Sequence, residues 1–142
     1  MKKLILMLML FAPIATFAQK FGHINSQTVI ESLPEYVKAR AEVEGQAKAF
    51  DNDLQAMQKE IQTKAEAYDK SASTMNDTKR KETEAELQGL YQKFQQAQQD
   101  NSQALQKLQQ EKMQPIISKL QNAIKNVGKA GGYVYIMDVS SG

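Results

Sequence analysis

Very few residues in this sequence could carry out covalent chemistry. His23 is the only histidine and there is no cysteine, so a metal site or a nucleophile–base pair would have to be built around one imidazole. The glycines show neither spacing of a phosphate-binding loop, and no Gly-x-Ser-x-Gly sequence occurs. We therefore predict no enzyme, with no catalytic, cofactor-binding or metal-binding residues. His23 is assigned to a strand, beside a turn or an interface.

The other candidate functional groups are basic side chains near the middle of the chain. Lys79, Arg80 and Lys81 are consecutive and follow a break in the helical pattern, and Lys70 lies just before that break. Acidic residues surround them, so the simplest interpretation is a mixed, solvated helix surface. The functional alternative is an electrostatic contact with an acidic partner or a weak contact with a membrane surface.

Residues 1–18 have the three parts of a secretory signal peptide. A basic start is followed by an apolar run from Leu4 to Phe11, and small residues at Thr16 and Ala18 precede a cut after Ala18. The apolar run is shorter than the ~20 residues that a membrane span needs. We predict export and cleavage, rather than an N-terminal membrane anchor.

Cleavage would leave a chain of balanced charge. Residues 1–18 contain two lysines and no acid, so Lys plus Arg falls from 18 to 16 and equals the 16 Asp plus Glu. A balanced chain lacks the basic excess that is typical of nucleic-acid binding, so we predict no nucleic-acid partner.

Two long helices must position the charged groups, because apolar residues recur at heptad spacing in two stretches. The positions of the first stripe are Tyr36, Arg40, Val43, Ala47, Phe50, Leu54, Met57, Ile61, Lys64 and Tyr68, and those of the second are Leu87, Leu90, Phe94, Ala97, Asn101, Ala104 and Leu108. Residues 71–77 separate them and are small and polar, with Thr74 as a candidate helix cap. The pattern predicts a long antiparallel coiled-coil hairpin over residues 34–112 with its tip at 71–77.

Beyond Leu108 the apolar stripe changes phase near Pro115, where we also expect a kink. The new stripe consists of Met113, Ile117, Leu120, Ile124 and Val127. An offset of two residues rotates the apolar face by about 200°, so this face should have no partner within the chain. Gly128, Gly131 and Gly132 should end the helix.

One strand is predicted at each end of the hairpin, at residues 21–25 and 133–139. A two-stranded unit is marginal in water, so we predict a homo-oligomer whose base is a shared β-sheet core wrapped by helix ends. The residues predicted to hold this base together are Phe21, Ile24, Ile117, Leu120, Ile124, Val134 and Ile136. A monomeric or dimeric hairpin and an antiparallel four-helix bundle are the alternatives.

The predicted fold class is therefore mainly α with a small β body. Residues 19–142 form one domain, in which 19–33 and 113–142 are the base and 34–112 are the arm.

The N-terminal stretch is the most specific part of this pattern. Residues 21–26 read FGHINS and lead into residues 29–36, which read VIESLPEY, before the long charged hairpin and the terminal strand YVYIMD. With its signal peptide, the sequence resembles the Skp/OmpH family of periplasmic chaperones over the whole mature chain. That resemblance implies a homotrimer with a β-barrel-like body and three arms around a cavity. It also implies ATP-independent holding of unfolded outer membrane proteins in the periplasm.

The resemblance has two departures. The family has basic arm tips, which Lys79, Arg80 and Lys81 match only in part because acids surround them. Members also continue past the terminal strand with more strand and a short helix, which implies either a smaller body or further sequence after Gly142. An exported coiled-coil spacer of the cell envelope and an amphipathic lipid-surface binder are the other hypotheses. Neither of these needs a strand at each end of the hairpin.

Overall fold

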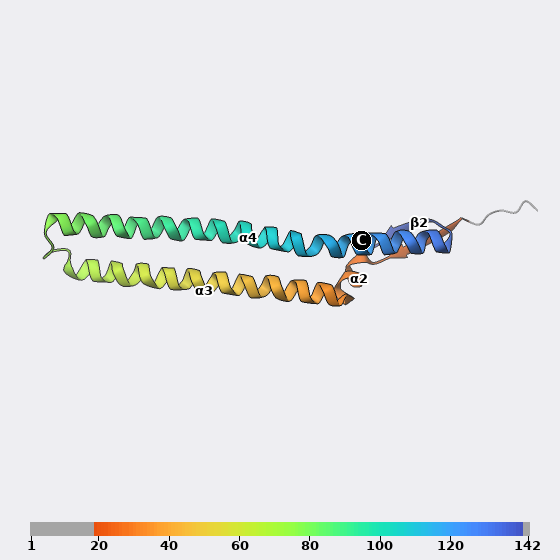
Figure 1. Ribbon diagram of the computed structural model, residues 1–142, viewed down its shortest axis with the longest axis horizontal. Helices are drawn as coiled ribbons and strands as arrows, with labels where there is room; N and C mark the ends of the chain where they lie inside the picture. Colours follow the sequence, from red (N-terminus) through yellow and green to blue (C-terminus); the bar gives the residue numbers. More distant parts are fainter. Residues whose placement is uncertain (1–18, 141–142) are drawn as a thin grey trace, which may run out of the picture.

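The computed structural model describes residues 19–140, so the predicted signal peptide lies outside the described residues. The elements in chain order are β1 (Lys20–Ile24), α2 (Ser26–Ser32), α3 (Pro34–Ser71), α4 (Asp77–Gly131) and β2 (Tyr133–Asp138). Helices α3 and α4 lie side by side and antiparallel, as a long hairpin (Figure 1). This confirms the predicted fold class, with the turn inside the predicted tip.

The two helices of the hairpin differ in length. Helix α3 has 38 residues and α4 has 55, which correspond to about 57 Å and about 80 Å at 1.5 Å per residue. Helix α4 therefore continues past the start of α3, and β1, α2 and β2 lie along this extension (Figure 1). We call the extension with these three elements the base, and the paired helices the arm.

The contact between α3 and α4 follows the predicted stripes with local exceptions. Every predicted position on α3 is buried or half-buried except Arg40, which is exposed and pairs with Glu44 of its own helix. Ala39 is buried in its place. On α4 the predicted Ala104 is exposed and Leu105 is half-buried. These one-residue shifts arise because a helix with 3.6 residues per turn drifts from a strict seven-residue repeat.

The last turns of α4 pack partly against their own chain, so the prediction that they lack an internal partner is wrong for Leu120. Ile116 and Leu120 are buried, with 5% and 7% of their surface exposed. Ile116 lines a pocket with Leu33, and Leu120 lines another with Ile136 of β2. From Leu108 the contact advances in steps of four residues, which turns the apolar face by about 40° per step instead of in one jump.

Helix α4 runs through Pro115 without a break in the helix. Its N-terminus is capped by Asn76, whose side chain accepts a hydrogen bond from the N–H of Lys79 at 2.8 Å. The predicted cap, Thr74, instead donates its hydroxyl to the carbonyl of Ser71. At the other end Gly132 adopts a left-handed conformation with φ of 65°, which terminates the helix as predicted.

The two predicted strands pair with each other in a two-stranded parallel sheet. Phe21 lies opposite Tyr135, but Lys20 lies opposite Tyr133, so Val134 has no partner in β1. Lys20 also donates to the carbonyl of Gly131 at 3.1 Å and lies 4.3 Å from the centre of the Tyr133 ring. The start of β1 is thereby attached to the C-terminus of α4, where cations are favourable.

Asp138 joins the end of β2 to the start of α2. Its carboxylate accepts hydrogen bonds from the N–H groups of Ser26 at 3.2 Å and Ser140 at 3.0 Å. Hydrogen bonding with the side chain of Ser26, followed by these bonds from the N–H groups of Ser26 and Ser140, lowers the pKa of Asp138 to about 2. Lys20 thus attaches the start of β1 to α4, and Asp138 attaches the end of β2 to the start of α2.

Two glycines should respond in opposite ways to replacement by alanine. Gly132→Ala is expected to lower the free energy of unfolding by about 1–2 kcal/mol, because an L side chain is strained in the left-handed conformation. Gly45 lies inside α3 and a Cβ there would meet no atom within 4 Å, so Gly45→Ala is expected to raise it by up to about 1 kcal/mol. Urea unfolding followed by circular dichroism measures both, and effects of the same sign would contradict the prediction.

Candidate functional site

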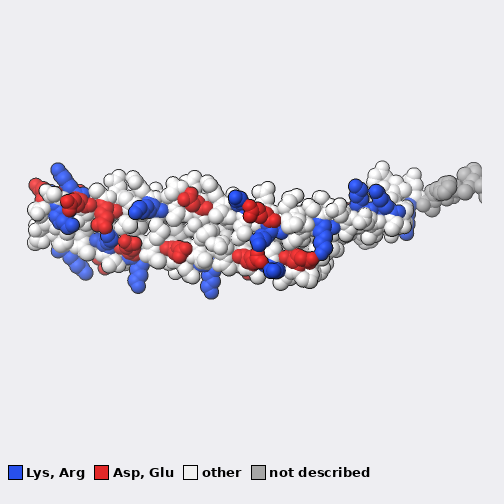
Figure 2. All heavy atoms as spheres, in the orientation of Figure 1, with Lys and Arg blue, Asp and Glu red and all other residues white. Residues whose placement is uncertain are grey.

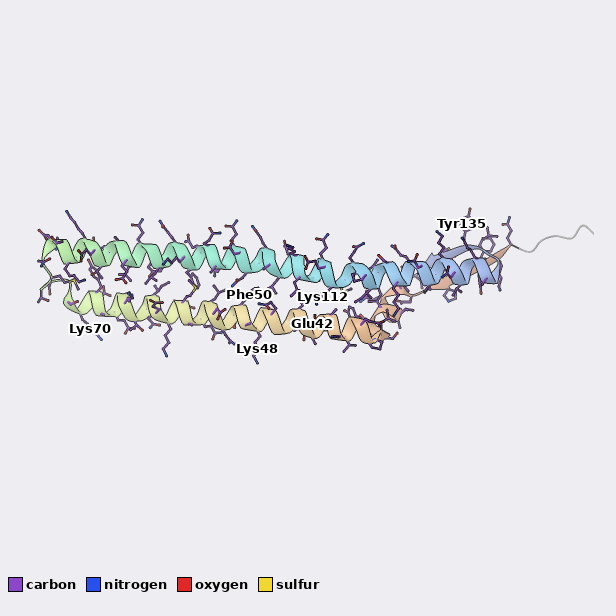
Figure 3. The ribbon with its side chains drawn as sticks, viewed as in Figure 1. Glu42, Lys48, Phe50, Lys70, Lys112 and Tyr135 are labelled. Atoms are coloured by element: carbon purple, nitrogen blue, oxygen red, sulfur yellow. The ribbon has the colours of Figure 1, made fainter. Side chains whose placement is uncertain are left out.

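The outer face of the base sheet is apolar and uncovered. The rings of Phe21 and Tyr135 stack with centroids 6.1 Å apart, yet these side chains are 56% and 65% exposed. Val134 and Met137 extend this exposed surface, and Tyr135 projects outward from the base (Figure 3). A small sheet with an exposed apolar face gains stability when another apolar surface covers it.

The residues predicted to hold copies together lie on two sides of the base. Phe21 and Val134 are both exposed, and Phe21 stacks on Tyr135 at the outer face. The inner group lines a pocket between the sheet and α4 and consists of Ile24, Leu120, Ile124 and Ile136. Ile117 is half-buried on α4. The inner group therefore packs within the chain, whereas the outer pair is free to contact another copy.

Sequence reasoning missed Tyr135, Met137 and Val127, which are all strongly exposed at the base. Alternation along β2 could have found Met137, because residues two apart on a strand share a face and Tyr135 lies opposite Phe21. Val127 was expected on the free face of α4 and is 60% exposed, but it was not predicted as an assembly residue.

At the tip of the arm the predicted basic residues are partly neutralised. Arg80 pairs with Asp77 at 2.7 Å and Lys79 with Glu82 at 3.6 Å, all within α4. Lys70 and Lys81 are exposed and form no ion pair within residues 19–140. Basic and acidic side chains are intermixed over this end of the molecule (Figure 2). The tip therefore presents scattered charge and not a continuous basic patch.

Ion pairs connect α3 to α4 close to the base. Lys119 bonds to Glu35 and Lys112 to Glu42, and Figure 3 shows Glu42 and Lys112 between the two helices. In each pair the hydrogen bond from the lysine is the main reason that the pKa of the carboxyl lies below its ordinary value. The pair formed by Lys119 and Glu35 shows that α3 and α4 are still in contact beyond residue 112.

A second connection lies close to the tip. Lys64 bonds to Glu86 and lowers the pKa of that carboxyl, again mainly through the hydrogen bond. One turn further on, the hydroxyl of Tyr68 donates to Glu84, and this bond raises the pKa of the tyrosine. Lys64 and Tyr68 are both positions of the predicted α3 stripe. Their stems are therefore half-buried in the contact while their polar ends reach across to α4.

Grooves flank the contact between the helices of the arm. Near the base, Ala39 and Lys112 line two grooves, one with Tyr36 and Met113 and one with Pro115. A third groove lies nearer the tip and has a volume of about 550 Å³. The arm is therefore a loosely closed hairpin with open flanks.

Neither a metal centre nor a membrane span is found in residues 19–140. No group of three or more His, Asp or Glu side chains is placed to hold a metal ion there. Within the same range no helix combines the length and apolar character needed to cross a bilayer. His23 lies in β1 and lines the pocket between the sheet and α4.

Comparison with known proteins gives a match over nearly the whole chain. The family described as outer membrane protein (OmpH-like) matches residues 20–142, from β1 through the arm to the end of the base. The chain belongs to the OmpH-like family. This confirms the resemblance found in the sequence, and the match includes both the helical arm and the more specific N-terminal stretch.

Relatives of this OmpH-like chain are chaperones. The chaperone protein Skp of Yersinia enterocolitica is 28% identical over 134 residues, which cover 94% of this chain and 82% of that protein. The chaperone protein Skp of Vibrio cholerae is 28% identical over 132 residues, covering 93% and 78%. The one from Pectobacterium atrosepticum is 25% identical over 124 residues, covering 87% and 75%.

The OmpH-like chain should lose stability in acid. Because the pKa values of Glu35, Glu42 and Glu86 are lowered on folding, their stabilising contribution is complete above the ordinary carboxyl pKa of about 4.3 and is lost as the pH falls through the folded-state values. The melting temperature is therefore expected to be lower at pH 3 than at pH 7. Replacing these three residues with Gln should make the drop smaller, whereas Glu60→Gln, on the exposed surface of α3, serves as the control. An equal drop in the triple variant and the control would contradict this assignment.

Proposed function

We propose that this chain is an ATP-independent holdase chaperone of the periplasm, which binds unfolded outer membrane proteins and prevents their aggregation. The observation that carries the proposal is the match with chaperones over 94% of the chain, through arm and base alike. The predicted export signal in residues 1–18 supports the compartment. The proposed activity requires binding alone, without catalysis or a cofactor.

The arm has the surface that a holdase needs. Most side chains at the contact between its helices are only half-buried. Phe50, Met57 and Tyr68 therefore keep part of their apolar surface accessible. Long Lys and Gln side chains cover the remaining faces, and their stems are apolar while their ends are polar. Such a surface offers many weak contacts without strong sequence preference. A bound unfolded chain is then prevented from associating with other unfolded chains.

We infer that the base is completed by further copies of the chain, as a homotrimer whose arms enclose a client. The exposed apolar side chains of Phe21, Val134, Tyr135 and Met137 support assembly, because covering them with another apolar surface is favourable. Within residues 19–140 the sheet has two strands, so both of its edges can accept further strands. At the arm tip, Lys70 and Lys81 are the basic groups available for an acidic client or a weak membrane contact.

One experiment tests the proposed function directly. The mature chain, beginning at Gln19, is expected to have the mass of three chains in light scattering. It is also expected to keep a urea-diluted outer membrane β-barrel protein in solution without ATP. A stable monomer that leaves the client aggregating would contradict the proposal and favour a spacer of the cell envelope.

A double variant tests the outer face of the base. Phe21→Ser with Tyr135→Ser should shift the mass in light scattering towards a single chain, because burial of a large apolar side chain contributes about 1.5–3 kcal/mol. Val37→Ser is the matched control, since Val37 is 59% exposed on α3, away from the sheet. An unchanged mass in the double variant would rule out this face as the assembly surface.

A further inference from the structure

The groove nearer the tip of the arm combines an apolar floor with polar walls. Ile61 and Ala65 of α3 and Phe94 of α4 contribute the apolar side chains. Ile61 is buried and the other two are half-buried. The groove has a volume of about 550 Å³, which lies within the range of pockets that bind ligands. It is open along one flank of the arm and lies far along α3 and α4 from the base.

Tyr91 is the exposed aromatic residue of this groove. It lines the groove while 52% of its surface remains accessible. Within residues 19–140 the other strongly exposed large apolar side chains lie at the base or, for Val37, at the start of α3. Tyrosine has an apolar body and a polar end, and it is enriched where proteins contact partners. An uncovered tyrosine above an apolar floor therefore marks a contact surface on the arm.

The charge of the groove has one sign. Glu66 and Asp69 line it, and none of its lining residues is Lys or Arg. Gln62 donates to Glu66 at 3.0 Å, which holds this carboxylate in place and leaves acceptor positions free. Neither acid forms an ion pair within the described part of the chain. The groove is therefore locally acidic, although the predicted mature chain has balanced charge.

We propose that this groove binds an extended client segment in which an aliphatic or aromatic side chain lies beside a Lys or Arg. The apolar side chain contacts Tyr91 and Ile61, and the basic group lies beside Glu66 and Asp69. Glutamines of both helices line the groove and can donate to and accept from the peptide groups of an extended chain. This inference rests on the proposed holdase function and gives it a sequence preference, which the scattered charge of the arm tip does not provide.

Peptide binding tests the proposed preference. Two short, unstructured, fluorescently labelled peptides would carry Leu-Tyr at the centre, followed in one by Lys and in the other by Glu. Anisotropy titration of the mature chain is expected to show roughly fivefold tighter binding of the Lys peptide at low ionic strength, and a smaller difference at high salt. Equal binding of the two peptides would overturn the proposal.

Variants locate the binding. Tyr91→Ala is expected to weaken binding of the Lys peptide about tenfold, whereas Tyr91→Phe and the control Val37→Ala should retain it. Glu66→Gln with Asp69→Asn should abolish the preference for Lys. The control Asp51→Asn with Asp53→Asn should keep it, since Asp51 accepts the same type of hydrogen bond, from Gln55 at 2.7 Å. The test with these charge variants remains valid even if Tyr91→Ala fails to fold.

The outcomes separate this inference from the holdase proposal. Unchanged peptide binding in Tyr91→Ala would overturn it, as would a loss of preference in the Asp51 and Asp53 control. If Tyr91→Ala changes the mass of the assembly but leaves peptide binding unchanged, the groove is instead a contact between copies of the chain. If the chain still prevents client aggregation in these cases, the holdase function stands and the groove assignment alone fails.

Discussion

The parallel pairing of β1 with β2 is the constraint on which the rest of the structure depends. Parallel strands need a crossover connection, and here the connection is the whole of α2, α3 and α4. The chain leaves the base along α3 and returns along α4. Because β1 and β2 both lie along α4 beyond the start of α3, α4 must be the longer helix. The unequal lengths of the two helices are thus required by the sheet and are not an irregularity of the coiled coil.

The ion pairs between α3 and α4 lie towards the two ends of the arm. Glu35 and Glu42 pair with lysines of α4 near the base, and Lys64 pairs with Glu86 near the tip. Between these connections the helices meet through the buried Ile61 and through half-buried side chains, with Asn101 on the contact. Exposed ion pairs contribute little energy each, so their main effect is to fix which faces of the helices meet. The flanks between them remain open enough to form grooves.

Local patterns predicted most of this fold. The heptad stripes, the polar break at 71–77 and the aromatic and β-branched run at 133–139 gave the helices, the turn and the strands, because each depends on nearby residues. The errors concern features that depend on residues far apart, namely the rotation of the helix contact along α4 and the register of the two strands. The gradual rotation of the contact brought Leu120 onto the sheet, and the unpaired Val134 left Tyr135 opposite Phe21. The groove at Tyr91 needs residues from both helices, so no single stretch of sequence could indicate it.

The attachment of Lys20 to Gly131 spans a sequence separation of 111 residues. Contacts within each helix are local, and those between α3 and α4 need only the short turn that joins them, so both can form early. The sheet can form only once the residues after α4 are present. A chain interrupted before residue 133 would lack β2, and therefore both the paired sheet and the aromatic face formed by Phe21 and Tyr135. The surface proposed for joining other copies can therefore form only after residues 133–138 are present, so assembly has to follow synthesis of this last strand.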